Sequence, residues 1–251
     1  IYSRVADKDE EVYFSVPCGN FGNAVAGLFA IRMGLPAKLI IGVNENDVFA
    51  RYYETGSYEP AKETKPSPSN SMNINWPSNM RRLFQLYQGQ LIESRDPENP
   101  ELKIVDPRSI IPKPSSMKHE IAGAYSIKDW KSDAIVHNFY RERYPYDDAD
   151  EYRNIQDENL IIESHGSVAL GATQRFRQQT GCKGKIVSFE TADPGKFPES
   201  LQEIGVQPSL PLTLGRLVNR PHGRNFILEN DYSQVKSLVI QLYNQELARY
   251  R

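Results

Sequence analysis

The feature that most constrains the fold is a strand–turn–helix–strand pattern early in the chain. Residues 11–16 are short, rich in β-forming side chains and followed by proline, which predicts a buried strand. A turn rich in glycine and asparagine, residues 17–23, leads into a predicted helix at 24–33 that Gly34 ends. Residues 38–43 form a second apolar run. This βαβ unit predicts an α/β fold with a doubly wound parallel sheet.

Weaker patterns follow this unit. Residues 44–53 predict the start of a helix, with Asn44 or Asn46 as its cap. Residues 55–79 are rich in Ser, Pro, Asn and Thr, and a loop of that length in a globular domain is usually functional. We further expect helices at 80–90, 117–145, 165–179 and 234–250, strands ending at 160–163 and spanning 185–189, and a proline-rich surface excursion at 96–114.

Composition narrows the class of protein. Hydrophobic residues make up 39% and charged residues 25%, so the chain has enough apolar side chains to form a core. The formal charge of -2 does not favour a nucleic-acid surface, which needs a clustered basic excess. No apolar run approaches the roughly 18 residues that span a bilayer.

Cysteine and histidine usage bears on the compartment and on metals. Cys18 and Cys182 are the only cysteines, too few for a disulfide framework in a chain of this length. We therefore expect a reduced, cytosolic protein. The four histidines share no metal-ligand spacing, so we predict no structural zinc.

The turn at residues 17–23 is the best candidate for a ligand site. At such a turn several backbone N–H groups point to one place, and the helix dipole favours negative charge. We expect a phosphate to bind the N–H groups of five consecutive residues: Gly19, Asn20, Phe21, Gly22 and Asn23. The turn has neither the ending of a nucleotide P-loop nor the dinucleotide spacing, so ATP and NAD are disfavoured. A tight turn that binds nothing remains the alternative.

Several blocks of the sequence resemble threonine synthases, in the order of that family. The most specific block is residues 17–23, followed by Gly27, Gly34-Leu35-Pro36 and Asn44-Glu45-Asn46-Asp47. The others are residues 67–74, 77–83, 163–169 and 190–197. The resemblance spans most of residues 11–240 and is weak between 92 and 155.

The resemblance implies a fold of type II, like that of the tryptophan synthase β subunit, with pyridoxal phosphate as cofactor. It implies that Gly19 to Asn23 hold the cofactor phosphate and that Thr191 places its hydroxyl near the pyridine nitrogen. The implied reaction converts O-phosphohomoserine and water to threonine and phosphate. The phosphate of the substrate requires a second anion-binding site. The candidate residues for it are Ser78, Asn79, Arg81 and Arg82. Alternatively, the two arginines bind no phosphate and are only solvent-exposed residues at the start of a helix.

One residue that the resemblance requires is absent. Enzymes of this kind hold the cofactor as a Schiff base on a lysine, well upstream of the turn in this family. The only lysine before the turn is Lys8, without the family's Ser-Phe-Lys-Asp context. We therefore expect the lysine to lie upstream of Ile1, and the chain to be a C-terminal portion that alone folds poorly and shows no turnover. A split enzyme and a pseudoenzyme are alternatives.

Within such a portion, residues 1–251 divide into three expected parts. Residues 11–91 would bind the cofactor phosphate, 92–155 would be an insertion or peripheral segment, and 156–251 would carry the pyridine-contacting loop.

Some residues depart from the family pattern. Asn73 replaces aspartate, Asp193 replaces histidine, Glu163-Ser164 replaces Asp-Pro, and Gly166 replaces a larger residue. Residue 165 keeps its histidine, which is more often a core or capping residue than a base, while Lys196 could serve either phosphate or only cover the surface. Two other functions stay open: a phospho-lyase that gives 2-oxobutyrate, and a non-catalytic domain that binds a phosphorylated metabolite.

Overall fold

The computed structural model of this chain describes residues 1–141, 161–218, 220, 225–229 and 231–249. The chain divides into two compact units, Ile1–Leu210 and Pro211–Arg251. The described part of the second unit contains two helices, α8 (Leu212–Val218) and α9 (Tyr232–Arg249). The expected closing helix at 234–250 is α9.

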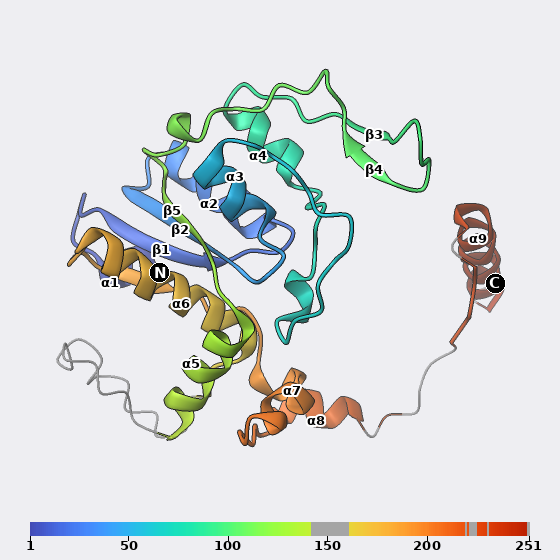
Figure 1. Cartoon of the computed structure of the whole chain (residues 1–251). Helices are drawn as coiled ribbons and strands as arrows, with labels where there is room; N and C mark the ends of the chain where they lie inside the picture. The colour runs from blue at the N-terminus through green and yellow to red at the C-terminus, as the bar shows by residue number, and fades with distance from the viewer. Residues whose placement is uncertain (142–160, 219, 221–224, 230, 250–251) are drawn as a thin grey trace. The chain divides into compact units, whose positions relative to one another are not determined.

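A four-stranded parallel sheet forms the centre of the first unit (Figure 1). Its strand order is β5 (Ile121–Ser126), β2 (Ala37–Val43), β1 (Val12–Pro17), β6 (Ile186–Ser188). Each neighbouring pair is parallel. The predicted parallel sheet is confirmed, with strands at 11–16, 38–43 and 185–189 within one or two residues of their expected bounds.

Helices cover both faces of this sheet, so the fold is doubly wound (Figure 1). On one face, α2 (Gly22–Arg32), α3 (Val48–Thr55) and α4 (Met80–Leu86) pack against Leu39 and Ile41. On the other face, α6 (Ser164–Thr180) packs against Ile40. Successive β2 side chains thus point to opposite faces and both are buried, which explains why its sequence is a continuous apolar run.

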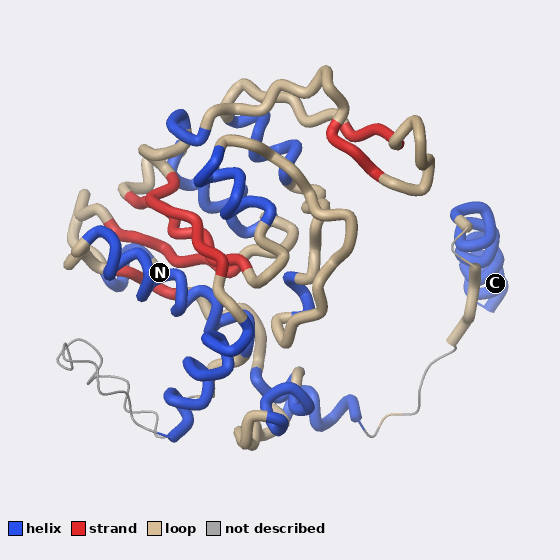
Figure 2. The backbone as a smooth tube through the Cα atoms, in the orientation of Figure 1, coloured by secondary structure: helices blue, strands red, loops and turns tan. Residues whose placement is uncertain are grey.

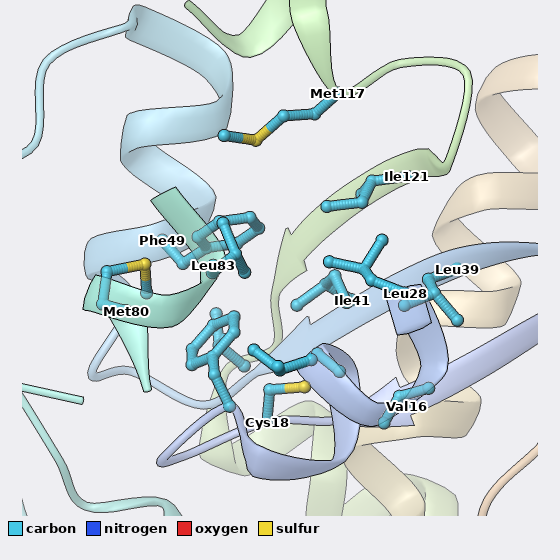
Figure 3. Packing of buried hydrophobic residues seen from close by; sticks show 14 of the residues in the cluster. Val16, Cys18, Leu28, Leu39, Ile41, Phe49, Met80, Leu83, Met117 and Ile121 are labelled. Atoms are coloured by element: carbon cyan, nitrogen blue, oxygen red, sulfur yellow. The ribbon is translucent and has the colours of Figure 1, made fainter. Parts of the chain in front are cut away.

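The larger core lies under α2, α3 and α4 (Figure 3). An aromatic series runs through it, with ring centroids 4.8 Å apart between Phe21 and Phe49 and 5.1 Å apart between Tyr52 and Phe84. All four side chains are fully buried or nearly so. Burying a large apolar side chain contributes about 1.5–3 kcal/mol, so this core anchors the turn through Phe21, the residue before α2.

The remaining described elements are short, apart from one helix. They are α1 (Tyr2–Val5), η1 (Asn70–Met72), β3 (Glu93–Arg95), β4 (Lys103–Val105), η2 (Pro114–Ser116), α5 (Asp129–Arg141), η3 (Pro194–Lys196) and α7 (Pro198–Glu203). β3 and β4 form a separate antiparallel pair. Figure 2 shows the long irregular loop predicted at 55–79 as a tan stretch between α3 and α4, interrupted only by η1.

The expected helix at 117–145 is wrong over its first half. Ile121–Ser126 is strand β5, whose alternating burial places Ile121 and Tyr125 inside and which pairs with β2. Its sequence contains Ala122, Gly123 and Ala124, small residues that carry little β signal, so pairing with β2 decides its conformation. The helix begins only at Asp129, and residues 142–145 lie outside the described residues.

Three smaller expectations also need correction. Residues 161–163 are not a strand, and residue 160 lies outside the described residues; Glu163 caps α6 instead. Neither Asn44 nor Asn46 caps α3, because both side chains are engaged with the loop at 65–73 and Asp47 occupies the cap position. The helix expected at 80–90 ends at Leu86.

Candidate functional site

The carboxyl ends of β1 and β6 meet at the point where the sheet changes direction. From β1 the chain moves to β2 and β5 on one side, and later returns to place β6 on the other side of β1. In open α/β sheets, ligands bind outside the carboxyl ends of the strands at such a switch point. The turn at 18–23 follows β1 there, and Thr191 follows β6, three residues after Ser188, which is the register partner of Ser15.

The turn after β1 presents a row of backbone donors. Within the described part of the chain, the N–H groups of Gly19 to Asn23 have no hydrogen-bond acceptor. Phe21 adopts a left-handed conformation, with φ 62° and ψ 13°, and its buried ring holds the turn on the core. Strain at a non-glycine residue of this kind persists only where packing fixes it. The N–H row is therefore set in place by the fold.

The Asn23 side chain closes the turn on itself. Its amide nitrogen donates to the Pro17 carbonyl oxygen at 2.7 Å, and its oxygen accepts from the Ala24 N–H at 2.9 Å. Cys18 lies below in the core, where burial raises the pKa of its thiol, so this cysteine stays protonated (Figure 3). Both cysteines of the chain are free thiols.

Two of the residues expected at the substrate phosphate support the turn. The Ser78 N–H and hydroxyl donate to Asn20 Oδ1 at 2.5 and 3.0 Å. Asn79 Nδ2 donates to the Asn20 carbonyl oxygen at 2.9 Å. The structure thus joins Ser78 and Asn79 to the turn after β1.

The two arginines that follow differ in their surroundings. Arg82 donates a hydrogen bond to Asn79 Oδ1 at 2.5 Å, so it is linked to the turn through the Asn79 side chain. Arg81 instead pairs with Glu93 of β3 at 3.0 Å. Both guanidinium groups are exposed, which makes Arg82 the better placed cation for an anion at the turn.

A buried amide network holds the loop at 65–73 against the sheet. Asn44 Nδ2 and Asn46 Nδ2 donate to Asn73 Oδ1 at 2.9 and 3.3 Å, while Asn73 Nδ2 donates to the Ser67 carbonyl oxygen at 3.2 Å. A carboxylate at residue 73 would have only acceptors and would face the Ser67 carbonyl. This network explains why asparagine fits here in place of the aspartate of the family pattern.

The same loop closes on the glycine of the turn. A Cβ atom on Gly19 would lie 2.6 Å from Met72 Cα and 2.8 Å from the Ser71 carbonyl oxygen. No side chain fits in that space, since real contacts are essentially never so short. Glycine at residue 19 is therefore required by the neighbouring loop.

The segment after β6 carries the expected pyridine contact. Thr191 is exposed, and its hydroxyl has no hydrogen-bond partner among the described residues. Asp193 caps the short helix η3, because its carboxylate accepts from the Gly195 N–H at 2.8 Å. Lys196 is exposed with its ammonium 5.5 Å from the centre of the Phe197 ring. Asp193 therefore stabilises the start of η3, two residues after Thr191.

His165 is a buried connecting residue at the start of α6. Its Nδ1 contacts the Glu163 carboxylate, and its Nε2 accepts a hydrogen bond from the Ser71 N–H at 3.2 Å. An accepting Nε2 requires a neutral ring with its proton on Nδ1. The structure thus favours the core and capping role over a catalytic base, and it ties α6 to the loop that covers Gly19.

Sequence reasoning missed an acidic pair at this end of α6. The buried Glu163 carboxylate accepts from the N–H groups of His165 and Gly166 at 2.8 and 3.0 Å. Glu190, the last residue before Thr191, hydrogen-bonds to Glu163. The available signal was that residue 166 is a glycine where the family pattern has a larger residue.

Two kinds of feature are absent from the described residues. No group of three or more possible metal ligands occurs among them. No helix in the same part of the chain is long and apolar enough to cross a membrane.

Comparisons with known proteins agree on one family. The family model described as "Threonine synthase, C-terminal" matches residues 166–239. The chain is 28% identical over 254 residues to threonine synthase of Eremothecium gossypii, covering 95% of this chain and 48% of that protein. It is 30% identical over 208 residues to threonine synthase of Schizosaccharomyces pombe, covering 77% of this chain and 39% of that protein. The chain thus spans about half the length of the curated relatives it matches.

Solved structures give the same result for the fold. Threonine synthase from Brucella melitensis, described as bound to PLP, superimposes with a TM-score of 0.69 at 25% identity, covering 94% of this chain and 47% of that one. Threonine synthase from yeast superimposes with a TM-score of 0.70 at 24% identity, covering 95% of this chain and 48% of that one. The resemblance found in the sequence is confirmed: over most of its length this chain is similar to threonine synthases and shares their fold type II architecture.

Proposed function

We propose that this chain forms part of a threonine synthase, which converts O-phosphohomoserine and water to threonine and phosphate with pyridoxal phosphate as cofactor. The observation that carries the proposal is the row of N–H groups from Gly19 to Asn23, free of acceptors among the described residues and placed at the switch point of the sheet. The similarity to threonine synthases over 95% of the chain supports it.

The residues at the turn fit a phosphate monoester. The donors are neutral backbone groups at the N-terminus of an 11-residue helix, which favours an anion. Gly19 has no side chain, so the covering loop packs directly against the turn and holds it in place. Arg82, held by Asn79, adds a positive charge near this turn. In this proposal Ser78 and Asn79 hold Asn20, and Arg81 with Arg82 remain candidates for the substrate phosphate.

Thr191 has the neutral hydroxyl that the pyridine nitrogen requires in this proposal. Pyridoxal phosphate supplies a ring that takes up electrons when protons leave the substrate carbons. A hydroxyl does not force the ring nitrogen to stay protonated as a carboxylate would, so Thr191 tempers that withdrawal of electrons. Asp193 orders the segment that carries it. A cytosolic location accompanies this proposal and is supported by the two free thiols.

Reduction with borohydride tests the proposal on the protein at its natural full length. We expect intact mass to show one pyridoxyl adduct, and incubation with O-phosphohomoserine to release threonine and phosphate in equal amounts. Release of 2-oxobutyrate and ammonia in place of threonine would identify a phospho-lyase. Phosphate binding with no adduct and no product would identify a non-catalytic binding domain.

A further inference from the structure

Gly166, which departs from the threonine synthase pattern, contacts Glu190 in this structure. The family pattern has a larger residue at this position. A Cβ atom on Gly166 would lie 1.8 Å from a carboxyl oxygen of Glu190. The Glu190 carboxyl group thus occupies the space that a side chain at residue 166 would need.

Glu163 is the partner of that carboxyl group. Its side chain is fully buried and accepts three hydrogen bonds, from the N–H groups of His165 and Gly166 and from His165 Nδ1. It also shares a hydrogen bond with the Glu190 side chain, while the Glu163 N–H donates to Glu190. Two ionised carboxylates offer only acceptors, so this contact requires one proton. Because three donors already stabilise the ionised Glu163, the proton belongs to Glu190.

We propose that Glu190 is a positioning residue, whose carboxyl group fastens the segment 190–197 to the N-terminus of α6 and so fixes Thr191 at the carboxyl end of β6. A second contact within the same segment supports this, since the Phe197 ring lies 5.2 Å from the His165 ring. The fastening itself rests on the contacts above, and only the role of Thr191 toward the cofactor rests on the proposed function.

The surroundings of Glu190 keep its proton in place at neutral pH. The ionisable groups that face it are Glu163 and His165 from the start of α6 and Asp193 from its own segment. Glu190 is exposed as a residue, but its carboxyl end lies against Gly166 at the start of α6. The loss of hydration there, followed by the hydrogen bond and the charge of Glu163, raises the pKa of Glu190 to about 9. A raised folded-state pKa gives a stabilisation that is complete below the unfolded value of 4.5 and is lost as pH rises through about 9.

Carbon-13 NMR of the natural full-length protein, labelled at the glutamate carboxyl carbons, tests the fastening. We expect one resonance to titrate near pH 9 and to vanish in Glu190→Gln, but to persist in the exposed control Glu98→Gln. Gly166→Ala should shift the titration of that resonance by several pH units toward ordinary values, because the new methyl group displaces only the end of a flexible side chain.

Thermal unfolding between pH 5 and pH 10 gives the second readout. Glu190→Gln keeps a hydrogen-bond donor, so its midpoint should exceed that of the natural protein above pH 9 and vary less with pH. Glu190→Ala should show the flat profile without that gain. Identical pH profiles for the natural protein, Glu190→Gln and Glu98→Gln, or a Glu190 resonance that titrates near pH 4, would overturn the proposal.

Cofactor binding separates this inference from the proposed function. If Glu190 positions Thr191, Glu190→Ala should weaken binding of pyridoxal phosphate several-fold, and Glu190→Gln should restore it. If the natural protein binds no pyridoxal phosphate at all, the proposed function fails while the titration still decides whether Glu190 is protonated.

Discussion

The turn after β1 and the segment after β6 lie at neighbouring strand ends but are held by different chemistry. The groups that contact the turn directly are neutral: the loop at Ser71 and Met72 against Gly19, the hydrogen bonds from Ser78 and Asn79, and the buried ring of Phe21. The segment is held by ionisable groups, through Glu163 and Glu190. A neutral scaffold keeps its geometry across pH, whereas a shared proton makes geometry depend on pH.

Because the two regions are held differently, they also restrict the amino acids that can occupy them in different ways. At residue 19 the available space restricts the amino acid to glycine, because no Cβ atom fits there. At residue 190 the number of protons is decisive, and glutamine could replace glutamate because its amide also donates a hydrogen bond. Variants at the two places should therefore fail for different reasons, and the following measurements test that contrast.

Gly19→Ala should have the largest effect. Its Cβ would meet backbone atoms of Ser71 and Met72, which cannot swing aside like a side chain, so we expect a loss of about 3 kcal/mol in the free energy of unfolding. Urea denaturation of the natural full-length protein measures this loss. Gly22→Ala is the matched control, because its nearest neighbour is Asn79 Nδ2 at an ordinary 3.5 Å. Equal stability of the two variants would contradict the close contact at residue 19.

Glu163→Ala should have the second largest effect on the free energy of unfolding. It removes the cap of α6 and the partner of His165 Nδ1, and we expect a loss of about 2 kcal/mol in the free energy of unfolding. Glu98→Ala, in an exposed loop, should change stability by less than about 0.5 kcal/mol. If Glu163→Ala behaves like this control, the buried acid does not support the start of α6.

Asn20→Ala should destabilise by about 1 kcal/mol, because Ser78 loses its acceptor at an exposed site. Unlike the loss in Glu190→Ala, this loss should stay constant between pH 5 and pH 10, since no group at this contact titrates there. Asn20→Asp sharpens the comparison: it keeps the acceptor but places a negative charge beside the N–H row. We expect it to retain stability and to weaken phosphate binding, as measured by isothermal titration. A pH-dependent loss in Asn20→Ala would contradict the neutral character of the turn.

The sequence predicted what depends on local pattern. The apolar runs at 11–16 and 38–43, with a glycine-rich turn between them, were sufficient to predict the parallel sheet and the location of the N–H row. Strand β5 was missed because Ala122, Gly123 and Ala124 have no strong local preference, and only the edge of β2 makes them a strand.

Contacts between residues far apart in the chain could not be predicted from the sequence. Ser78 and Asn79 were expected to bind a substrate phosphate, and no local pattern could show that they contact Asn20, almost sixty residues earlier. The Glu163–Glu190 pair joins residues 27 positions apart through the sheet, so its shared proton could be recognised only in three dimensions. The roles of the site residues toward cofactor and substrate remain predictions.

Arg82→Gln should have the smallest effect on stability and a selective effect on binding. Its guanidinium is exposed, so the free energy of unfolding should change by less than about 0.5 kcal/mol. Because Arg82 lies next to the residue that holds the turn, its loss should weaken phosphate binding by roughly threefold to tenfold at low salt, and less at high salt. Arg81→Gln is the matched comparison, since its charge is already paired with Glu93. A larger loss in Arg81→Gln would place the binding cation on the side of β3, and the anion site would then extend away from the turn.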